Sequence, residues 1–356
     1  MKFEVIAKKY LDFYVPNYQI LLDGIDILKA YPIGITSVTV EDALEGADRF
    51  LFSVSDPGAM WLDSDLFEPG KSVVIRMGYV NNLSTMIHGE ISSIRSSFPR
   101  DGTPGLDISG YDLSHQFARG RGQNSFEGVR DSDIVAEIAG RANHRLETQI
   151  DETEVIHPHV THDGRTDYDF IRKLANRNSF EFYVRGETLY FQRTRRGGSE
   201  IVTLKYGASL LSFTPELNTA NQPTGVRLGG WNPQTREPIV GQAMRGSEEA
   251  RERGRRSGGD MIEDQYGDAE EHITDSPVSS QQEADTLTSS MLNRQSEGLI
   301  SGTAECIGLP EIRAGENIRL EGLGRKFSRR YYIESARHTI SSSGYNTSFN
   351  VKENTI

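Results

Sequence analysis

The chain has 356 residues, a formal net charge of −12 at pH 7 and one cysteine, Cys306. This length allows two or three domains with buried cores. The acidic balance argues against nucleic acid as a partner, because phosphate binding requires clustered Lys and Arg. One cysteine excludes an internal disulfide. No apolar run approaches the roughly 20 residues of a membrane-spanning helix, so we expect no direct membrane insertion.

The first residues do not resemble a signal peptide. The stretch MKFEVIAKKYLDFYVP contains Glu4 and Asp12 and lacks both a long apolar core and a small-residue cleavage site. We expect the protein to be cytoplasmic during assembly, unless a larger particle carries it out of the cell.

Residues 1–118 predict a first β-rich domain. Ile20–Leu22 and Ile25–Leu28 flank an Asp-Gly turn, as in a hairpin. Phe50–Ser55 alternates in the manner of a strand, and Val73–Met77 follows a Pro-Gly turn. Several short strands at this spacing, broken by Gly and Pro, favour a barrel or a sandwich.

Residues 119–199 predict a small α/β module. Asp131–Ala142 has apolar residues at helical spacing, with Asp131 or Ser132 available as its N-cap. The polar stretch Leu146–Arg165 that follows indicates a loop or a short strand.

The same module ends in a helix that runs directly into a β-hairpin. Thr166 and Asp169 resemble a capping box, and apolar residues then fall on one helical face. Phe180, Phe182 and Val184 alternate as a strand, and the chain returns after a turn at residues 185–187.

Residues 200–356 predict a second β-rich domain, interrupted at about 246–274. That interruption is crowded with Glu, Arg, Asp and Gly, so we expect a flexible insertion that trypsin cuts first after Arg251–Arg256. Ser280 and Glu283 then predict the start of a helix. The fold class that we expect is mainly β with an α/β module (α+β).

The best candidate for a metal site is the run of His157, His159, His162 and Asp163. Three imidazoles can bind Zn²⁺, and residues at i and i+2 share one face of a strand. The alternative is an exposed polar connection, which we favour because no established metal-binding motif supports the cluster. We therefore predict no metal ligands and no cofactor.

No catalytic residues are predicted either. A nucleophile elbow is absent, and Cys306 lies in an alternating apolar strand, which indicates a buried core thiol rather than a nucleophile. Trp61, Leu62 and Phe67 lie between two predicted strands. They either close one end of a barrel or contact a neighbouring subunit.

The helix and hairpin of residues 166–191, TDYDFIRKLANRNSFEFYVRGETLYF, resemble the signature of the phage late-control D family. This family comprises the baseplate hub proteins of contractile phage tails and contractile injection systems. The corresponding run is Ser/Thr-Asp-x-x-Phe-(Ile/Leu)-x-x-Leu-Ala. Further segments are similar in the same order: ADRFLFSVSDPGAMWLDSDLFEPGKSVVIRMGY, MIHGEISSI, LDISGYDL, GLISGTAECIGLPEIRAGENIRLEG and YYIESARHTISSSGYNTSF.

The resemblance implies a structural virion component rather than an enzyme. It implies two tube-like β-barrels plus a small helix-hairpin domain, and PGKSVVI (69–75) and AGENIRL (314–320) share a pattern that suits two related units. It also implies a homotrimer that joins a six-fold inner tube to a three-fold spike. Since the sequence ends without a spike region, we expect a separate spike protein of the valine-glycine-repeat type, with tube subunits and other baseplate proteins as further partners.

Two alternatives from other functional classes stay open. A metal-dependent cell-wall hydrolase depends only on the His cluster. A carbohydrate-binding β protein is compatible with the composition, but no motif supports it.

Overall fold

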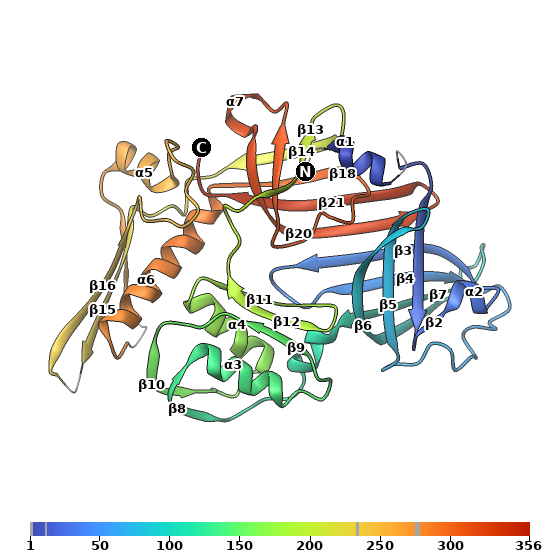
Figure 1. Ribbon diagram of the computed structural model, residues 1–356, viewed down its shortest axis with the longest axis horizontal. Coiled ribbons are helices and arrows are strands. Elements are labelled where there is room, and N and C mark those ends of the chain that lie inside the picture. The colour runs from blue at the N-terminus through green and yellow to red at the C-terminus, as the bar shows by residue number, and fades with distance from the viewer. Residues whose placement is uncertain (1–2, 11–12, 233–234, 275–277) are drawn as a thin grey trace.

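The computed structural model describes residues 3–10, 13–232, 235–274 and 278–356 (Figure 1). The fold is mainly β, with 46% strand and 20% helix, as the sequence predicts. Strands from both β-rich regions join one 13-stranded sheet in the order β14-β18-β21-β20-β3-β4-β7-β6-β5-β1-β2, with β13 and β19 branching from β20. The first region supplies β1 (Pro16–Leu22), β2 (Ile25–Asp26), β3 (Gly34–Ala43), β4 (Arg49–Ser55), β5 (Ser72–Tyr79), β6 (Asn82–Ser97) and β7 (Gly105–Asp112). The second supplies β13 (Glu200–Lys205), β14 (Leu210–Leu217), β18 (Ile300–Ile307), β19 (Asn317–Glu321), β20 (Arg329–Ser341) and β21 (Gly344–Glu353).

The two regions meet where β20 pairs with β3. Their antiparallel ladder runs from Ser335 opposite Ala43 to Ser341 opposite Ser37. The long strand β20 pairs with β21 on one side, and on the other side with β19 near its start and β3 near its end. Within the described residues no sheet closes into a barrel and both regions share one sheet, so the predicted pair of tube-like barrels is not confirmed.

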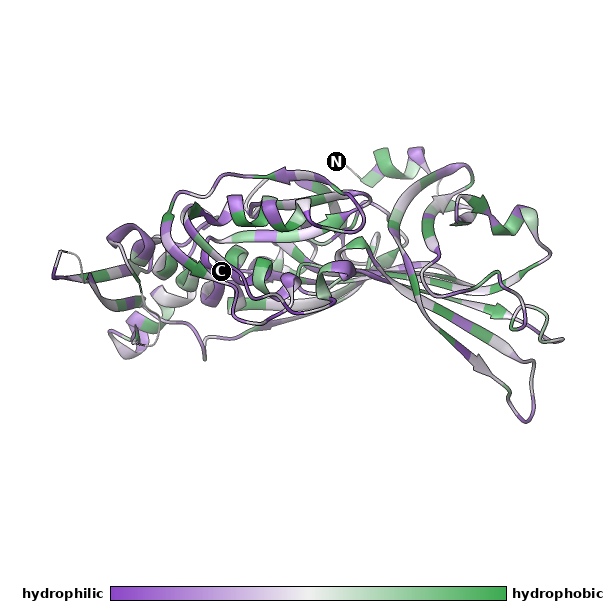
Figure 2. Cartoon of the chain, turned by 90° about the horizontal axis from the view of Figure 1, so that it is seen from below, coloured by the Kyte–Doolittle hydropathy of each residue, from purple (hydrophilic) through white to green (hydrophobic). Residues whose placement is uncertain are grey.

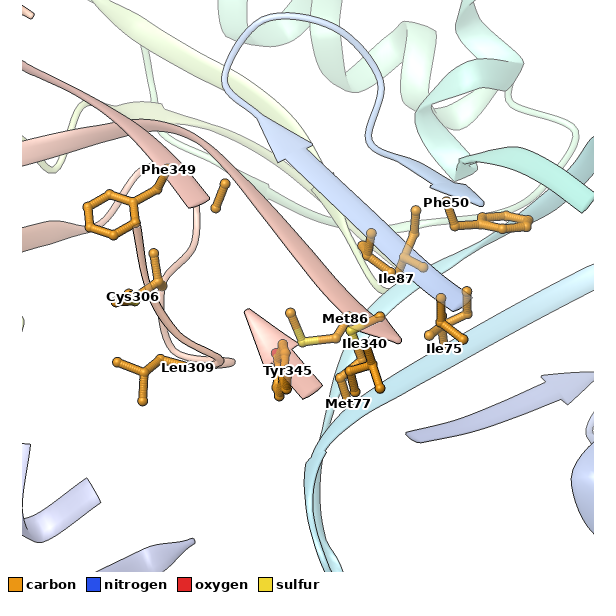
Figure 3. Close-up of a cluster of buried hydrophobic side chains, with 14 of the residues drawn as sticks. Phe50, Ile75, Met77, Met86, Ile87, Cys306, Leu309, Ile340, Tyr345 and Phe349 are labelled. Atoms are coloured by element: carbon orange, nitrogen blue, oxygen red, sulfur yellow. The ribbon is translucent and has the colours of Figure 1, made fainter. Parts of the chain in front are cut away.

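Alternation of side chains along the strands places the main core. Figure 2 shows hydrophilic and hydrophobic residues alternating along strands of the large sheet, as expected when one face is buried. Figure 3 shows the buried cluster that results, in which Phe50 and Met77 of the first region lie in one core with Leu309 and Phe349 of the second. Cys306 belongs to this core and is fully buried, which confirms the core thiol, and burial raises its pKa.

The α/β part lies beside this sheet and has a core of its own. Its elements are η2 (Leu113–Ala118, a 3-10 helix), β8 (Ser125–Arg130), α3 (Asp131–Gly140), β9 (Glu147–Ile150), β10 (Ile156–Thr161), α4 (Asp167–Arg177), β11 (Phe180–Arg185) and β12 (Thr188–Arg193). The Thr166 hydroxyl accepts a hydrogen bond from the Asp169 amide at 3.1 Å, so the predicted cap of α4 is confirmed. Phe170, Ile171 and Leu174 then face the second apolar cluster.

A third unit, with an apolar cluster of its own, lies on the left in Figure 1. Here β15 (Gly225–Asn232), β16 (Glu237–Met244) and β17 (Glu270–Ile273) form a sheet covered by α6 (Gln281–Ser296), with α5 (Gly258–Tyr266) nearby. Gly241 permits the close approach of α6, because a Cβ there would lie 2.6 Å from the Ala284 carbonyl oxygen. The remaining short helices are α1 (Phe3–Lys9), α2 (Ile27–Ala30), η3 (Glu297–Leu299) and α7 (Gly324–Phe327).

The segment predicted as a flexible insertion, 246–274, contains α5 and β17. Ile262 and Ile273 are both buried, and the main chain of Arg256 exchanges two hydrogen bonds with Ile356. The composition of the segment did not indicate these buried residues, because two apolar side chains change its average hydrophobicity very little. Its flexibility and its early cleavage by trypsin stay predictions. Among the helices of the described ranges, none is long and apolar enough to cross a membrane.

A buried ion pair joins the two regions beneath the β3–β20 ladder. Arg313, in the loop after β18, is 8% exposed, and its guanidinium pairs with the Asp42 carboxylate of β3 and donates to the Met86 carbonyl of β6 at 2.9 Å. Asp48 lies 4.0 Å from the same guanidinium. Burial, together with the neighbouring Asp112 and Asp42 carboxylates, raises the pKa of Asp48, and burial raises that of Asp112 to about 7.

Replacing Arg313 with Met removes the cation from this buried site. Breaking one side of a buried ion pair costs about 3–5 kcal/mol, so we expect the free energy of unfolding in urea to fall by about that amount. The control is Arg95→Met, which removes an exposed pair with Asp107 at 2.9 Å and should change it by less than about 1 kcal/mol. Equal values for Arg313→Met and the wild type would contradict the role given to this pair.

Asp112→Asn tests the buried carboxylates by their pH dependence. Because the pKa of Asp112 rises from 3.8 to about 7 on folding, the folded state binds its proton more tightly than the unfolded state. Stability therefore falls as pH rises between those two values. An Asn keeps the acceptor for the Ser114 amide, so the variant should show a smaller loss between pH 4 and pH 7 in urea titrations. The exposed Asp101→Asn should retain the wild-type slope, and an unchanged slope in Asp112→Asn would refute the assignment.

Candidate functional site: a polar cleft beside α4 and α6

A cleft of about 950 Å³ lies between β10, α4 and α6. Its charged lining residues comprise five cations and three carboxylates: Arg165, Arg172, Lys173, Arg177 and Arg294, with Asp163, Asp169 and Glu283. Helical spacing explains why α4 contributes so many of them. Its apolar residues occupy the face toward the core, so the residues between them face outward.

His157 sits in the inner wall of the cleft, between two carboxylates from different elements. Its side chain is 4% exposed, with Nδ1 at 3.2 Å from Glu283 of α6 and Nε2 at 3.6 Å from Asp131 of α3. Burial alone would lower the pKa of His157, but these two carboxylates outweigh it and raise the pKa. Burial likewise opposes ionisation of Glu283, yet hydrogen bonds from His157 and Ser279 lower its pKa to about 2.

Asp131 has a different role from the predicted cap. Helix α3 has Arg130 at its N-cap position, and the Arg130 amide donates to the Asp133 carboxylate at 3.0 Å. Asp131 is fully buried and pairs with the Arg177 guanidinium, in addition to its contact with His157. The carboxylate thus ties α3 to α4 and β10. The sequence did not indicate this role, because an Asp at the start of a predicted helix is a common N-cap residue.

The predicted His cluster does not converge on one point. His157 is buried between carboxylates, whereas the His159 side chain is 56% exposed and contacts Ser125. His162 is buried, with its ring edge-on to Phe170 at a centroid distance of 4.2 Å. Within the described ranges, no group of three His, Cys, Asp or Glu side chains could hold a metal ion. The exposed-connection interpretation is also wrong for two of the three histidines, which are buried.

The three residues predicted as a subunit interface divide into two kinds. Trp61 and Phe67 are buried in the main core, where Trp61 packs against Tyr31 and Phe67 against Phe52. Leu62 is 37% exposed. The first two therefore hold the β4–β5 loop in place, and Leu62 is left at the surface.

His157→Gln tests the contacts that join β10, α3 and α6. Because the folded-state pKa is raised above the usual 6.5, the contribution is complete below pH 6.5 and declines as pH rises through the higher value. Hydrogen bonds to charged groups contribute about 1.5–3 kcal/mol, so the variant should lose about that much stability at pH 6 and less at pH 9. His159→Gln, on the same strand but exposed, should match the wild type at both pH values. A pH-independent loss in His157→Gln would contradict a charged imidazole.

The fold is similar to that of solved bacteriophage and secretion proteins. The 43 kDa tail protein of prophage MuSo2 from Shewanella oneidensis is 12% identical, with a TM-score of 0.71 over 94% of this chain and 98% of that one. A tail protein from Neisseria meningitidis MC58 is 14% identical, with a TM-score of 0.69 over 96% and 97%. An E. coli component of the type VI secretion system, described as similar to T4 tail proteins gp27 and gp5, is 11% identical, with a TM-score of 0.57 over 94% and 76%. At these identities the likeness establishes a shared fold.

Sequence comparison assigns the family. No curated protein matches the chain. The family model described as Alg8 N-terminal domain matches residues 15–342, which is most of the chain. The late-control D signature of residues 166–191 stays a prediction beside this match. The chain belongs to the Alg8 N-terminal domain family.

Proposed function

We propose that the protein is a structural component of a contractile tail or injection particle, a baseplate hub that joins the inner tube to the spike. The observation that carries this proposal is the whole-chain likeness to tail proteins, which extends over 94% of this chain and 98% of the Shewanella protein. The likeness includes both β regions and the α/β part, so it concerns the architecture as a whole.

The physical character of the molecule supports a mechanical role. One sheet runs through both β regions, and the buried pair of Arg313 and Asp42 joins them. Such a body transmits force without bending at a linker, because its regions share one sheet and a core. The hydrolase alternative loses its support, since both nitrogens of His157 face carboxylates.

The proposed assembly is a trimer of chains with domains at 1–118, 119–199 and 200–356. Three chains with two related β regions each present six similar units, which suits a six-fold tube on one side and a three-fold spike on the other. We assign the β4–β5 loop to a subunit contact, with Leu62 and its exposed neighbour Met60 as contact residues. A separate spike protein and the first tube ring are the proposed partners, because the resemblance to hub proteins implies both.

Co-expression with spike and tube proteins from neighbouring genes tests this function. We expect a complex with three copies of the chain that survives 1 M salt, because permanent interfaces are large and relatively apolar. Met60→Asp with Leu62→Asp should leave monomers, whereas Tyr266→Asp, an exposed position on α5, should not. Mass photometry of the purified complexes measures the copy number. A monomer that retains neither partner but binds cell-wall polysaccharide would favour the carbohydrate-binding alternative.

A further inference from the structure

The cleft beside α4 and α6 concentrates positive charge in a protein whose net charge is −12. Five of its lining residues are Arg or Lys, against three carboxylates. A negatively charged molecule repels anionic partners over most of its surface, so a local cluster of cations defines where such a partner can bind.

The carboxylates of the cleft are already engaged within the chain. Glu283 accepts from the Ser279 amide at 2.8 Å and contacts His157. Asp163 lies 3.1 Å from the Arg165 guanidinium and 3.7 Å from the Lys173 ammonium. The third, Asp169, is hydrogen-bonded to the capping Thr166 hydroxyl. None of these three carboxylates forms an ion pair with Arg172, Arg177 or Arg294 in the described part of the chain.

Two arginines of the cleft have no carboxylate partner in the described part of the chain. Arg177 pairs with Asp131, but Arg172 and Arg294 form no ion pair with any residue in the described part of the chain. Arg172 comes from α4 and Arg294 from α6, so the two cations line the cleft from two different helices. The Asn176 carbonyl of α4 accepts from the Ser290 hydroxyl and, at 3.4 Å, from Arg294, which holds the two helices together.

The remaining lining residues indicate the class of ligand. A volume of about 950 Å³ is far larger than a single small anion and lies in the range of sites for larger ligands. Val160 and Leu287 add apolar surface. None of the described lining residues is Phe, Tyr or Trp, whereas single-stranded nucleic acid binds through bases stacked on aromatic rings. A peptide that carries carboxylates and interspersed apolar side chains matches this lining better than a nucleic acid does.

We propose that this cleft binds an acidic, extended peptide segment of a partner protein, and that Arg172 and Arg294 pair with its carboxylates. This site is separate from the β4–β5 loop and does not depend on the proposed trimer. Arg–carboxylate pairs are commonly bidentate, so the two guanidinium groups would select carboxylates that are spaced along the segment.

Fluorescence anisotropy of the purified full chain tests this site. The probe is a labelled peptide with three Glu-Leu-Glu-Gly repeats, and its neutral counterpart carries Gln in place of Glu. We expect saturable binding of the acidic probe only, weakening as salt rises from 50 to 300 mM. Arg172→Gln with Arg294→Gln should weaken binding at least tenfold. Arg100→Gln with Arg325→Gln, which removes two exposed cations elsewhere, should leave it unchanged.

Two further measurements keep the test decisive. Arg172→Lys with Arg294→Lys retains both charges but not the bidentate geometry, so it should bind the probe more tightly than the Gln pair and more weakly than the wild type, even if the Gln pair alters stability. A photoreactive probe should crosslink to segments of α4 and α6. The proposal is wrong if the acidic probe does not bind, if both Gln pairs bind it equally, or if single-stranded DNA of equal charge binds as tightly and depends on the same two arginines.

Discussion

The pairing of β20 with β3 is the constraint on which the rest of the architecture depends. These strands come from opposite ends of the chain, and their ladder turns two β-rich regions into one sheet. Beneath it, Arg313 and Asp42 pair across 271 residues of sequence, in a core from which water is excluded. A buried charge without its partner is strongly unfavourable, so arrangements that separate these two side chains while leaving them buried are disfavoured. His338 reinforces the same place, because its ring contacts the Ile312 carbonyl at 2.8 Å.

The α/β part makes polar contacts with this body outside the shared sheet; for example, the Arg185 guanidinium donates to the Ala314 carbonyl at 3.1 Å. His157 lies between Asp131 of α3 and Glu283 of α6, so it links the α/β part to the outer three-stranded unit. The cleft lies at this junction, where the two units meet without merging their apolar cores.

Local signals in the sequence predicted part of the local structure, but they missed the N-cap of α3 and the helix α5. The cap at Thr166 and the alternation after Phe180 depend on residues close together in the chain, and the structure has α4 and β11 at those positions. The pairing of β3 with β20 is different, because strand alternation does not specify a partner strand. The burial of Arg313 and Asp131 could not be predicted for a related reason. A charged residue is usually exposed, and its ion-pair partner is distant in the sequence. The sequence placed Arg172 and Arg294 in predicted helices but did not predict that they line one cleft, because the cleft forms only when the two helices pack together.

The central claim is that both β regions form one cooperative unit joined by the β3–β20 ladder. Hydrogen–deuterium exchange in increasing urea measures this most directly, because it reports the free energy of opening for each segment. The account predicts that peptides from β5 and β6 lose protection at the same urea concentration as peptides from β18 and β21. Loss of protection in one region at a clearly lower concentration, with the other still protected, would show two independent units and contradict the account.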